Sequence, residues 1–317
     1  MANPPPAFDI VTLTLNPAID ETVFLDRLTP GTVNRARGHH RQPGGKGVNV
    51  SAMLAGYGIP STATGFLGRE NPRLFEELFR ESGIRDECVR IAGETRTGIK
   101  ILSEATRETT DINFPGARPG GDDFEKLLEK LRLHAAPGRW IVVAGSLPDG
   151  ISTNDFASLL RLIKQSGARI AVDTSGPALQ AAIDCGVDLI KPNHHELAEI
   201  QGRELPDTAA RVAAATRLQR EKVPHVILSL GSEGAIFASP EGSCMAGPPP
   251  VKVVSTVGAG DSMLAGYLAG LHTGLPITGR AQLASVFAWC ALEDVRRKLP
   301  PLPVVEMRMA QVAVQPL

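Results

Sequence analysis

Residues 255–270 read Ser-Thr-Val-Gly-Ala-Gly-Asp-Ser-Met-Leu-Ala-Gly-Tyr-Leu-Ala-Gly, and the rest of the chain is organised around this stretch. Gly258, Ala259 and Gly260 lead into Asp261 and then into a segment rich in Ala, Leu and Met, which is typical of a packed helix. Such a turn leaves backbone N–H groups exposed at the positive end of the helix dipole, where proteins bind anions. A carboxylate in this place repels an anion, unless it takes a proton from the group that attacks the anion. The stretch therefore suggests phosphoryl transfer, with Asp261 as the general base.

A simpler explanation fits the same residues. An acidic residue in the first turn of a helix is favourable through the dipole alone, and on its own Asp261 fits a helix start better than a catalytic role. The stretch is not G-x-G-x-x-G, because Met263 replaces the third glycine, and no Gly-Lys-Ser/Thr follows as in a Walker A loop. The choice between the two explanations depends on the rest of the chain.

Length and charge narrow the class of protein. The 317 residues can bury a large core, either as one large α/β domain or as two smaller ones. Lys and Arg number 33 against 34 Asp and Glu, and no run of like charge stands out. The sequence therefore lacks the electrostatic pattern of a nucleic-acid-binding protein, and we expect a small-molecule partner.

Cysteine spacing and hydropathy indicate in which cellular compartment the protein is expected. The four cysteines, Cys88, Cys185, Cys244 and Cys290, are widely spread without a C-x-x-C pair, which argues against a zinc site and against a disulfide framework. The N-terminus, Met-Ala-Asn-Pro-Pro-Pro, has no basic segment followed by an apolar run, and no stretch of about 18 apolar residues occurs. We therefore expect a cytoplasmic protein that does not enter a membrane.

Strand-like and helix-like segments alternate along most of the chain. Strands are predicted at residues 9–15, 61–66, 140–144 and 169–173, and helices at 72–82, 122–134, 154–166, 177–185, 208–221, 279–298 and 304–312. This alternation predicts an α/β fold with a doubly wound, mainly parallel sheet flanked by helices. Residues 98–103 and 109–114 instead form short alternating β runs, which predict a small antiparallel β lid.

Polar residues follow the first predicted strand and the next glycine-rich turn. Asn16 and Asp20 lie just beyond the strand, where ligands bind in open α/β sheets, although turns also favour Asn and Asp. Residues 42–51 read Gln-Pro-Gly-Gly-Lys-Gly-Val-Asn-Val-Ser, so that two glycines, a lysine and an amide share one turn at the start of a helix. These four residues are Gly44, Gly45, Lys46 and Asn49. The combination makes a polyol or phosphate site at least as plausible as a plain loop.

Two further candidates each have a structural alternative. Arg96, at the edge of the lid, can reach an anion, but a lone arginine on a strand is usually a solvated surface charge. Asn193 and Glu196 are three residues apart on one helical face, and oxygen ligands of this kind suit Mg²⁺. On their own they fit a capping box better. His194 and His195 are adjacent and cannot easily share one metal ion, which makes a zinc site improbable.

Six motifs in a fixed order resemble the phosphofructokinase-B branch of the ribokinase-like carbohydrate kinases. They are Thr-Leu-Thr-Leu-Asn-Pro-Ala-Ile-Asp at 12–20, Pro-Gly-Gly-Lys-Gly-Val-Asn at 43–49, Gly-Ser-Leu-Pro at 145–148, Lys-Pro-Asn-His-His-Glu-Leu at 191–197, Ser-Leu-Gly at 229–231 and Ser-Thr-Val-Gly-Ala-Gly-Asp-Ser at 255–262. Each motif alone is only suggestive, but six in the family's order are specific. The resemblance covers nearly the whole chain and implies a single ribokinase-like domain over residues 1–317, with lid strands inserted at about 20–40 and 90–117.

The resemblance also implies roles for individual residues. The anion hole and the base correspond to Gly258, Ala259, Gly260 and Asp261. The sugar-phosphate positions correspond to Asp20, Gly44, Gly45, Lys46, Asn49, Arg96 and Arg35. The positions for Mg²⁺ and the nucleotide phosphates correspond to Lys191, Asn193 and Glu196, with Glu196 acting through water. The positions near the nucleotide correspond to Ser229, Gly231 and Gly234.

The implied activity is the phosphorylation of a ketohexose phosphate by ATP with Mg²⁺. The lid residues resemble those of kinases that convert fructose 1-phosphate to fructose 1,6-bisphosphate, while tagatose 6-phosphate and fructose 6-phosphate kinases share the same motifs. A non-catalytic sugar-phosphate sensor is a further alternative, against which the intact Asp261 argues. A nicotinamide-dependent dehydrogenase would need G-x-G-x-x-G after the first strand, and that motif is absent. The resemblance also implies a homodimer through the β lid, because thin sheets need a partner to pack against.

Two segments depart from the family pattern. The lid motif reads Thr-Arg-Thr-Gly at 95–98, where relatives commonly carry Asn in place of Gly98. Residues 292–302 are charged and rich in proline, where the family usually has small or amide residues around adenine. The adenine contacts are therefore not assigned from the sequence.

Overall fold

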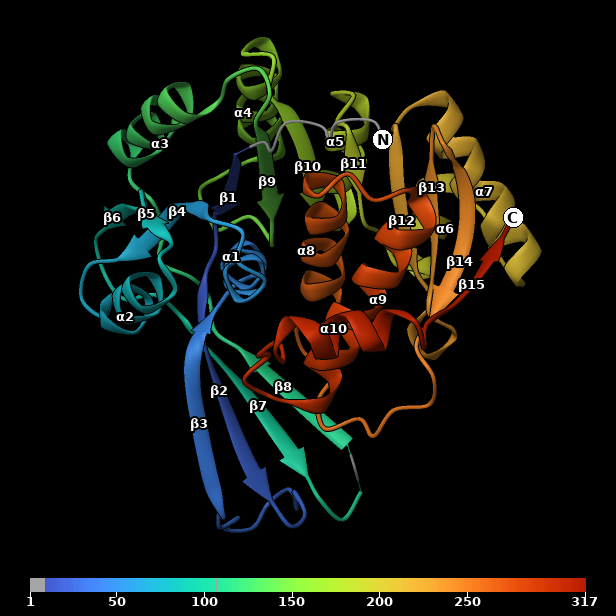
Figure 1. Cartoon of the computed structure of the whole chain (residues 1–317). Coiled ribbons are helices and arrows are strands. Elements are labelled where there is room, and N and C mark those ends of the chain that lie inside the picture. The colour runs from blue at the N-terminus through green and yellow to red at the C-terminus, as the bar shows by residue number, and fades with distance from the viewer. Residues whose placement is uncertain (1–8, 107) are drawn as a thin grey trace.

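Two β-sheets organise residues 9–106 and 108–317, the part of the chain that the computed structural model describes. One is an 11-stranded main sheet, and the other is a four-stranded small sheet that projects away from it (Figure 1). The first eight residues, for which the sequence predicts no targeting segment, lie outside the described part.

The main sheet confirms the doubly wound, mainly parallel architecture. Its strand order is β15-β14-β13-β12-β11-β10-β9-β1-β4-β5, with β6 paired to β4. All pairs from β12 to β6 are parallel, and the pairs from β12 to β15 are antiparallel. The strands are β1 (Ile10–Thr14), β4 (Ser61–Gly68), β5 (Arg85–Asp86), β6 (Val89–Ile91), β9 (Trp140–Ala144), β10 (Arg169–Asp173), β11 (Leu189–Ile190), β12 (His225–Ser229), β13 (Ala235–Ser239), β14 (Gly242–Gly247) and β15 (Ala313–Pro316).

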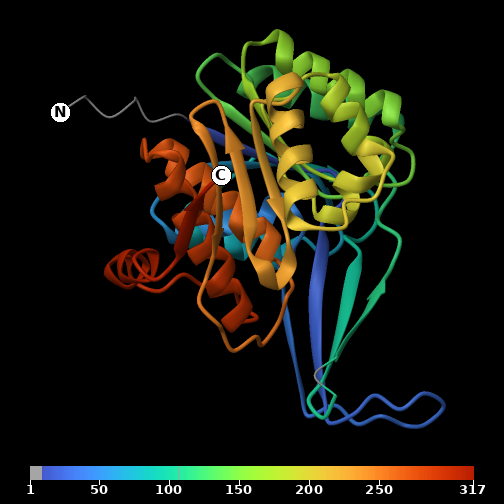
Figure 2. The same ribbon diagram turned by 90° about the vertical axis from the view of Figure 1, so that its right-hand side faces the viewer.

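Helices cover both faces of the main sheet, and each face has its own core (Figure 2). Strand β9 shows the division, because Ile141 and Val143 join the core beneath one set of helices while Trp140 and Val142 join the other. This follows from the alternation of side chains along a strand that is buried on both faces. The first set is α3 (Gly121–His134), α4 (Thr153–Gln165), α5 (Gly176–Asp184), α6 (His194–Gln201) and α7 (Thr208–Glu221). The second is α1 (Lys46–Gly56), α8 (Ala259–His272), α9 (Ile277–Glu293) and α10 (Leu302–Met309).

The small sheet consists of β3 (Gly38–Gly44), β2 (Ala18–Leu25), β7 (Thr97–Ser103) and β8 (Glu108–Asn113), in that order. Both of its hairpins, β2–β3 and β7–β8, are antiparallel, as the sequence predicts for the lid. The hairpins join through β2 and β7, which run parallel. Ile112 of β8 and Phe114, just beyond the end of β8, are exposed, so apolar side chains lie on the surface at this edge of the sheet.

The helix predicted at 279–298 is too long. Helix α9 ends at Glu293, and Asp294 adopts an extended conformation. The Asp294 carboxylate accepts a hydrogen bond from the backbone N–H of Arg296 at 2.9 Å. Local bonds of this kind compete with helical ones, so residues 294–298 leave the helix as a loop. The strands β5, β6 and β15 were also not predicted, because segments of 2, 3 and 4 residues are too short to show a hydrophobic period.

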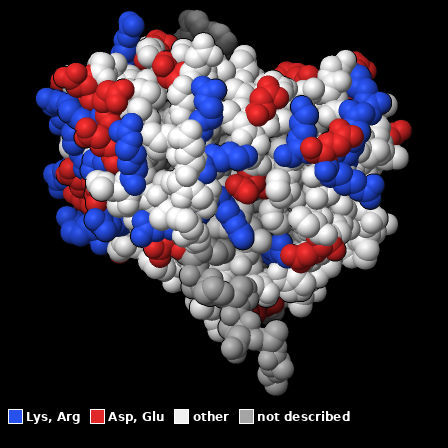
Figure 3. All heavy atoms as spheres, turned by 90° about the horizontal axis from the view of Figure 1, so that it is seen from above, with Lys and Arg blue, Asp and Glu red and all other residues white. Residues whose placement is uncertain are grey.

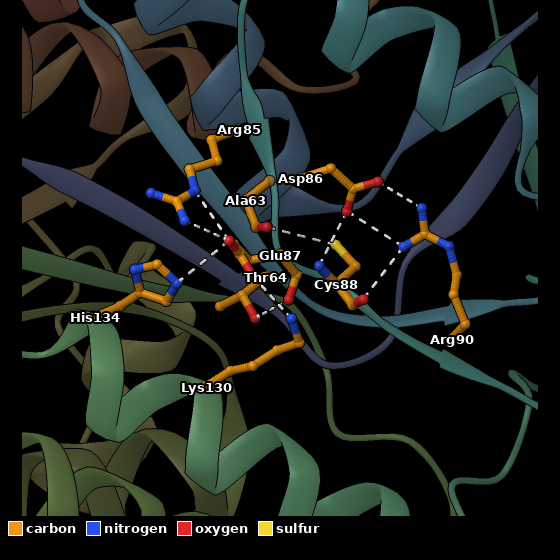
Figure 4. Close-up of polar contacts among 9 residues, drawn as sticks. All are labelled: Ala63, Thr64, Arg85, Asp86, Glu87, Cys88, Arg90, Lys130 and His134. Atoms are coloured by element: carbon orange, nitrogen blue, oxygen red, sulfur yellow. Dashed lines mark hydrogen bonds and ion pairs between the residues drawn. The ribbon is translucent and has the colours of Figure 1, made fainter.

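An ion-pair network ties the edge of the main sheet to the helix that covers it (Figure 4). Glu87, between β5 and β6, accepts hydrogen bonds from Lys130 of α3 at 2.8 Å and from Arg85 at 2.9 Å. Nearby, Arg90 pairs with Asp86 and, at 3.1 Å, with Glu76 of α2 (Arg73–Ser82). The network holds strands too short to be stable by backbone pairing alone.

The face opposite the small sheet carries Lys and Arg side chains interspersed with Asp and Glu (Figure 3). This face therefore has no large area of one charge sign. Among the described residues, no helix combines the length and the apolar character needed to cross a bilayer.

Candidate active site

Asp261 lies in the first turn of α8 and is only 7% exposed. Gly258 precedes the helix in the left-handed conformation, with φ of 76°, which favours glycine. A Cβ atom on this residue would also lie 2.6 Å from Cδ of Arg297. Ser255 Oγ accepts the Val257 N–H at 3.2 Å and stabilises the turn. The sequence 255–261 thus forms the glycine turn and helix start that it predicts.

Asn49 holds the Asp261 side chain. Its Nδ2 donates to Asp261 Oδ2 at 2.7 Å, although the two residues are 212 positions apart. Gly45 precedes α1 and accepts the Asn49 N–H at 2.9 Å, so the glycine-rich turn delivers Asn49 directly to the start of α8. Burial and then the nearby charge of Asp173 raise the pKa of Asp261, while Lys46 and the Asn49 hydrogen bond oppose this. A carboxylate with a raised pKa is a stronger base.

Lys46 and Lys191 converge on Asp173. Their Nζ atoms lie 2.8 Å and 3.0 Å from its two carboxylate oxygens. Asp173 is 1% exposed, and although burial alone raises its pKa, the two lysines hold it below its usual value. Burial on its own lowers the pKa of Lys46. The negative charges of Asp173, Asp261 and Glu196 outweigh burial, so the pKa of Lys46 is raised. A Cβ atom on Gly260 would lie 3.0 Å from Lys191 Nζ, so Lys191 lies beside the glycine turn. Lys46 shares Asp173 with it.

Asp173 was not predicted as a site residue. It is the last residue of β10, and the strand itself was predicted with the same bounds. The carboxyl ends of parallel strands meet at one edge of a sheet, which is the rule that selected Asn16 and Asp20. Applied to every predicted strand, that rule would also have selected Asp173.

Asp20 lies on β2, close to Gly44. A Cβ atom on Gly44 would lie 2.6 Å from Asp20 Cγ, so a larger residue at position 44 would displace the Asp20 side chain. Lys100 Nζ contacts Asp20 Oδ1 at 2.8 Å, and both Nη atoms of Arg297 contact Oδ2 at 3.3 Å. Neither cation was predicted, because each reaches Asp20 from an element distant in the sequence.

Arg96 lies at the junction of the two sheets. Its Nε donates to Asn16 Oδ1 at 3.1 Å, and Asn16 Nδ2 donates to Ser146 Oγ at 3.1 Å. Burial lowers the pKa of Arg96, and the charge of Asp20 opposes this shift. Arg35, by contrast, is exposed in the loop beyond the last β2–β3 pair, Phe24 and Gly38. The structure does not bring Arg35 together with the other candidates.

Gly98, the departure in the lid, pairs with Asp20 on β2 and with Asn113 on β8. A Cβ atom on Gly98 would lie 3.3 Å from Asn113 Oδ1 and 3.7 Å from Asp20 Oδ1. The space beside Gly98 is therefore shared by the Asn113 amide and the Asp20 carboxylate. An amide lies near Gly98, but it comes from the neighbouring strand β8.

Asn193 and Glu196 form the capping box that was the structural alternative to a metal site. Asn193 Oδ1 accepts the N–H groups of His195 and Glu196 at 2.9 Å, and Glu196 Oε2 accepts the Asn193 N–H at 2.8 Å. In the described residues, no group of three or more His, Cys, Asp or Glu side chains is arranged to hold a metal ion. The second oxygen of Glu196 is not used by the capping box. This leaves one carboxylate oxygen for a cation that retains several of its waters.

Ser229 is beside Asn193, because the two residues form an isolated parallel β-bridge. The Ser229 N–H donates to the Pro192 carbonyl at 3.0 Å. Gly231 begins the short 3₁₀ turn after β12, and Gly234 follows it before β13. A Cβ atom on Gly234 would lie 2.3 Å from the Ala246 carbonyl, so close packing against β14 already explains this glycine.

Comparison with known proteins gives a consistent result. A family model described as pfkB family carbohydrate kinase matches residues 13–301. The chain is similar to the 1-phosphofructokinase of Xanthomonas campestris pv. campestris, with 42% identity over 297 residues that cover 92% of this chain and 93% of the relative. It is 36% identical to the 1-phosphofructokinase of Escherichia coli K12 over 307 residues, which cover 97% and 98%.

Solved structures agree with these matches. Phosphofructokinase-2 from Escherichia coli in complex with substrates and products has a TM-score of 0.90 at 30% identity, covering 95% of this chain and 98% of that one. The tetrameric inhibited form of the same protein has a TM-score of 0.87 at 29% identity, covering 96% and 98%. Arabidopsis thaliana ribokinase, with a TM-score of 0.74 at 20% identity over 96% and 99% of the two chains, shares the ribokinase-like fold.

Proposed function

We propose that this chain, which belongs to the pfkB family of carbohydrate kinases, transfers the γ-phosphoryl group of ATP to fructose 1-phosphate and forms fructose 1,6-bisphosphate. The observation that carries the proposal is the buried Asp261, held at 2.7 Å by Asn49 at the start of α8. A carboxylate with a raised pKa beside a glycine turn and two lysines suits a base that acts next to a phosphate.

In this mechanism Asp261 takes the proton of the sugar 6-hydroxyl. The hydroxyl oxygen forms a bond to the γ-phosphorus, and the bond between that phosphorus and the β–γ bridging oxygen breaks, with its electron pair leaving on ADP. The turn of Gly258, Ala259 and Gly260 supplies backbone N–H groups for the charge that develops on the transferred oxygens. Asn49 orients the base, so that the reacting groups need little rearrangement.

The sugar phosphate is proposed to bind between the glycine turn before α1 and the small sheet. Asp20, buried next to Gly44, accepts hydrogen bonds from sugar hydroxyls, and Arg96 provides a cation for the sugar's phosphate. Gly45, Lys46 and Asn49 complete the proposed sugar-phosphate set. Arg35 is included from family resemblance alone, since its loop is exposed.

The nucleotide is proposed to bind along the carboxyl ends of β11 and β12. Lys191, Asn193, Ser229, Gly231 and Gly234 belong to this part of the site. Mg²⁺, when bound, would reduce the negative charge of the nucleotide phosphates. Glu196 would hold the ion through water, and the carboxylate oxygen that the capping box leaves unused supports this role.

Initial rates with three substrates test the assignment. Purified protein with Mg²⁺ and ATP should turn over fructose 1-phosphate with a higher kcat/KM than fructose 6-phosphate or tagatose 6-phosphate, and the product should be fructose 1,6-bisphosphate. A higher kcat/KM for either alternative would reassign the substrate within the family. Binding of sugar phosphate without any ATP turnover would instead support a sensor.

We also propose that the chain acts as a single kinase domain over residues 1–317, whose small sheet serves as a lid and as the homodimer interface. Exposed Ile112 and Phe114 support this, because a sheet this thin needs a packing partner. Sedimentation over a range of concentrations tests it: a dimer is expected, while a monomer or a tetramer throughout would contradict it. The similar E. coli protein has a form described as tetrameric.

A cytoplasmic location is part of the proposal. The four cysteines are free thiols in the structure, as a reducing compartment would keep them.

A further inference from the structure

Arg297 is a buried arginine that the proposed function does not use. It lies in the loop after α9, within the segment that departs from the family pattern, and its side chain is 6% exposed. Among the described residues other than glycine, it is the one with a positive φ, at 53°. Strained backbone of this kind persists where the surroundings enforce it. Here the Arg297 N–H donates to the Asp294 carbonyl at 2.8 Å, and Gln42 Nε2 donates to the Val295 carbonyl at 2.9 Å.

The Arg297 side chain extends from the side of the site proposed to bind ATP to the side proposed to bind the sugar phosphate. A Cβ atom on Gly258 would lie 2.6 Å from Arg297 Cδ and 2.9 Å from its Nη1, so the side chain rests against the glycine that opens α8. Its two Nη atoms are also 3.3 Å from Asp20 Oδ2. The guanidinium therefore lies between the turn proposed to bind the γ-phosphoryl group and the carboxylate proposed to bind the sugar.

The ion pair with Asp20 does not by itself explain this arrangement. Lys100 already contacts the other oxygen of Asp20 at a shorter distance, 2.8 Å. Arg297 uses a single carboxylate oxygen, through two long contacts, rather than the bidentate geometry that guanidinium and carboxylate groups favour. Two of its five N–H donors take part, so the group can also bind a further oxyanion.

We propose that Arg297 is a further catalytic residue, whose guanidinium contacts the phosphoryl group as it passes from ATP to the sugar hydroxyl. The inference rests on the proposed function. In the transfer, the hydroxyl oxygen bonds to phosphorus, the bond to the ADP oxygen breaks with its electron pair, and Asp261 receives the proton. Arg297 exchanges no proton or covalent bond, and its positive charge stabilises the negative charge on the phosphoryl oxygens. Its planar fork suits two of those oxygens at once.

Chemical rescue of Arg297→Gly tests this role. Glycine adopts a φ of 53° without strain, so the variant keeps the loop conformation. We expect kcat to fall by about 10²-fold or more, as for the loss of one preorganised donor, with KM for ATP little changed. Millimolar methylguanidine should restore activity with saturation, because it can occupy the vacated guanidinium position. A purely structural role would not give saturable rescue.

Two further variants control the experiment. Arg296→Gln removes the adjacent, exposed arginine and should retain wild-type kcat. Arg297→Lys keeps the charge but not the fork, so kcat should lie between those of the wild type and Arg297→Gly. If Arg297→Gly does not fold, the lysine variant decides the question, and a wild-type kcat in it overturns the proposal.

Failure of this inference can be told apart from failure of the proposed function. If the wild type phosphorylates a ketohexose phosphate but Arg297→Gly matches its kcat, the role of Arg297 is refuted and the kinase assignment stands. The same holds if the folded glycine variant is inactive and methylguanidine does not restore it. A wild type that phosphorylates none of the three sugars refutes both.

Discussion

At the scale of single residues, Asp261 and Asn49 carry the proposed chemistry. In the sequence alone, Asp261 fits a helix start, and Asn49 belongs to the glycine-rich turn at 42–51. Their contact at 2.7 Å holds the Asp261 side chain in place at the start of α8. The raised pKa of Asp261, caused by burial and by Asp173, makes it a better proton acceptor once it is ionised.

Replacing Asp261 with Asn should lower kcat by about 10²–10⁴-fold, because the amide cannot accept the hydroxyl proton. Steady-state rates with saturating ATP and sugar phosphate measure the effect. Asp122→Asn is a matched control, since Asp122 also lies in a first helical turn, of α3, but is exposed. Folded Asp261→Asn protein with a rate near that of the wild type would rule out the base.

Replacing Asn49 with Ala should shift the pH dependence of kcat. The hydrogen bond from Asn49 favours the ionised form of Asp261, so its loss raises the pKa of Asp261 further. A base acts only when deprotonated, and the acidic limb of the profile therefore moves to higher pH. A pH–rate profile of both proteins measures this, and an unmoved acidic limb would show that Asn49 does not tune the base.

At the scale of elements, strands buried on both faces were predicted correctly, whereas the end of a helix set by a local hydrogen bond was not. Strands β9 and β10 match their predicted bounds, because runs of apolar residues buried on both faces are easily recognised. Helix α9 ends five residues before its predicted end, where the Asp294 carboxylate accepts a hydrogen bond from the backbone N–H of Arg296. The prediction failed there because this bond depends on local geometry rather than on hydrophobic pattern. Arg297, which lies in the loop after α9, was therefore placed in a helix and was not predicted as a site residue.

Replacing Glu87 with Ala should lower the free energy of unfolding by about 1 kcal/mol, because Lys130 and Arg85 lose a shared, partly buried partner (Figure 4). Urea denaturation near neutral pH measures the loss. Glu81→Ala is the control, since its pair with Arg80 is 3.9 Å long and both side chains are more than 70% exposed. Its effect should stay below about 0.5 kcal/mol.

The effect of Glu87 should also depend on pH. Its hydrogen bond with Lys130 lowers its pKa in the folded protein, so the stabilisation is present above the unfolded pKa and is lost as pH falls through the folded one. The difference between wild type and Glu87→Ala should therefore narrow in acid. A difference that is independent of pH would show that packing, and not the ion pairs, is responsible.

At the scale of the whole molecule, a buried histidine couples stability to pH. Burial and then the charge of Arg280 lower the pKa of His225 to about 4 from 6.5. Between these values the unfolded chain binds a proton that the folded one does not. Stability should therefore decline as pH falls from about 6.5 to 4, by up to about 1.4 kcal/mol per unit from this residue.

A His225→Gln variant tests the coupling. Glutamine has no proton to gain in this range, so its unfolding free energy should decline less steeply with falling pH than that of the wild type. Denaturant unfolding at several pH values measures both slopes. Equal slopes would mean that His225 does not contribute to the pH dependence of stability. Its ring forms a hydrogen bond with the Tyr267 hydroxyl at 3.0 Å.

Sequence alone determined the order of strands and helices, the parallel sheet and the glycine turn before Asp261, since these depend on hydrophobic periodicity and on residues adjacent in the chain. It also selected Asp20, because ligands bind where parallel strands end, and Lys46 and Asn49, because they share a glycine-rich turn at a helix start. The tertiary structure alone decided which charges meet: Lys46 and Lys191 on Asp173, and Lys100 and Arg297 on Asp20. Those contacts join residues from 18 to 277 positions apart, and no local pattern encodes a partner that only folding brings within reach.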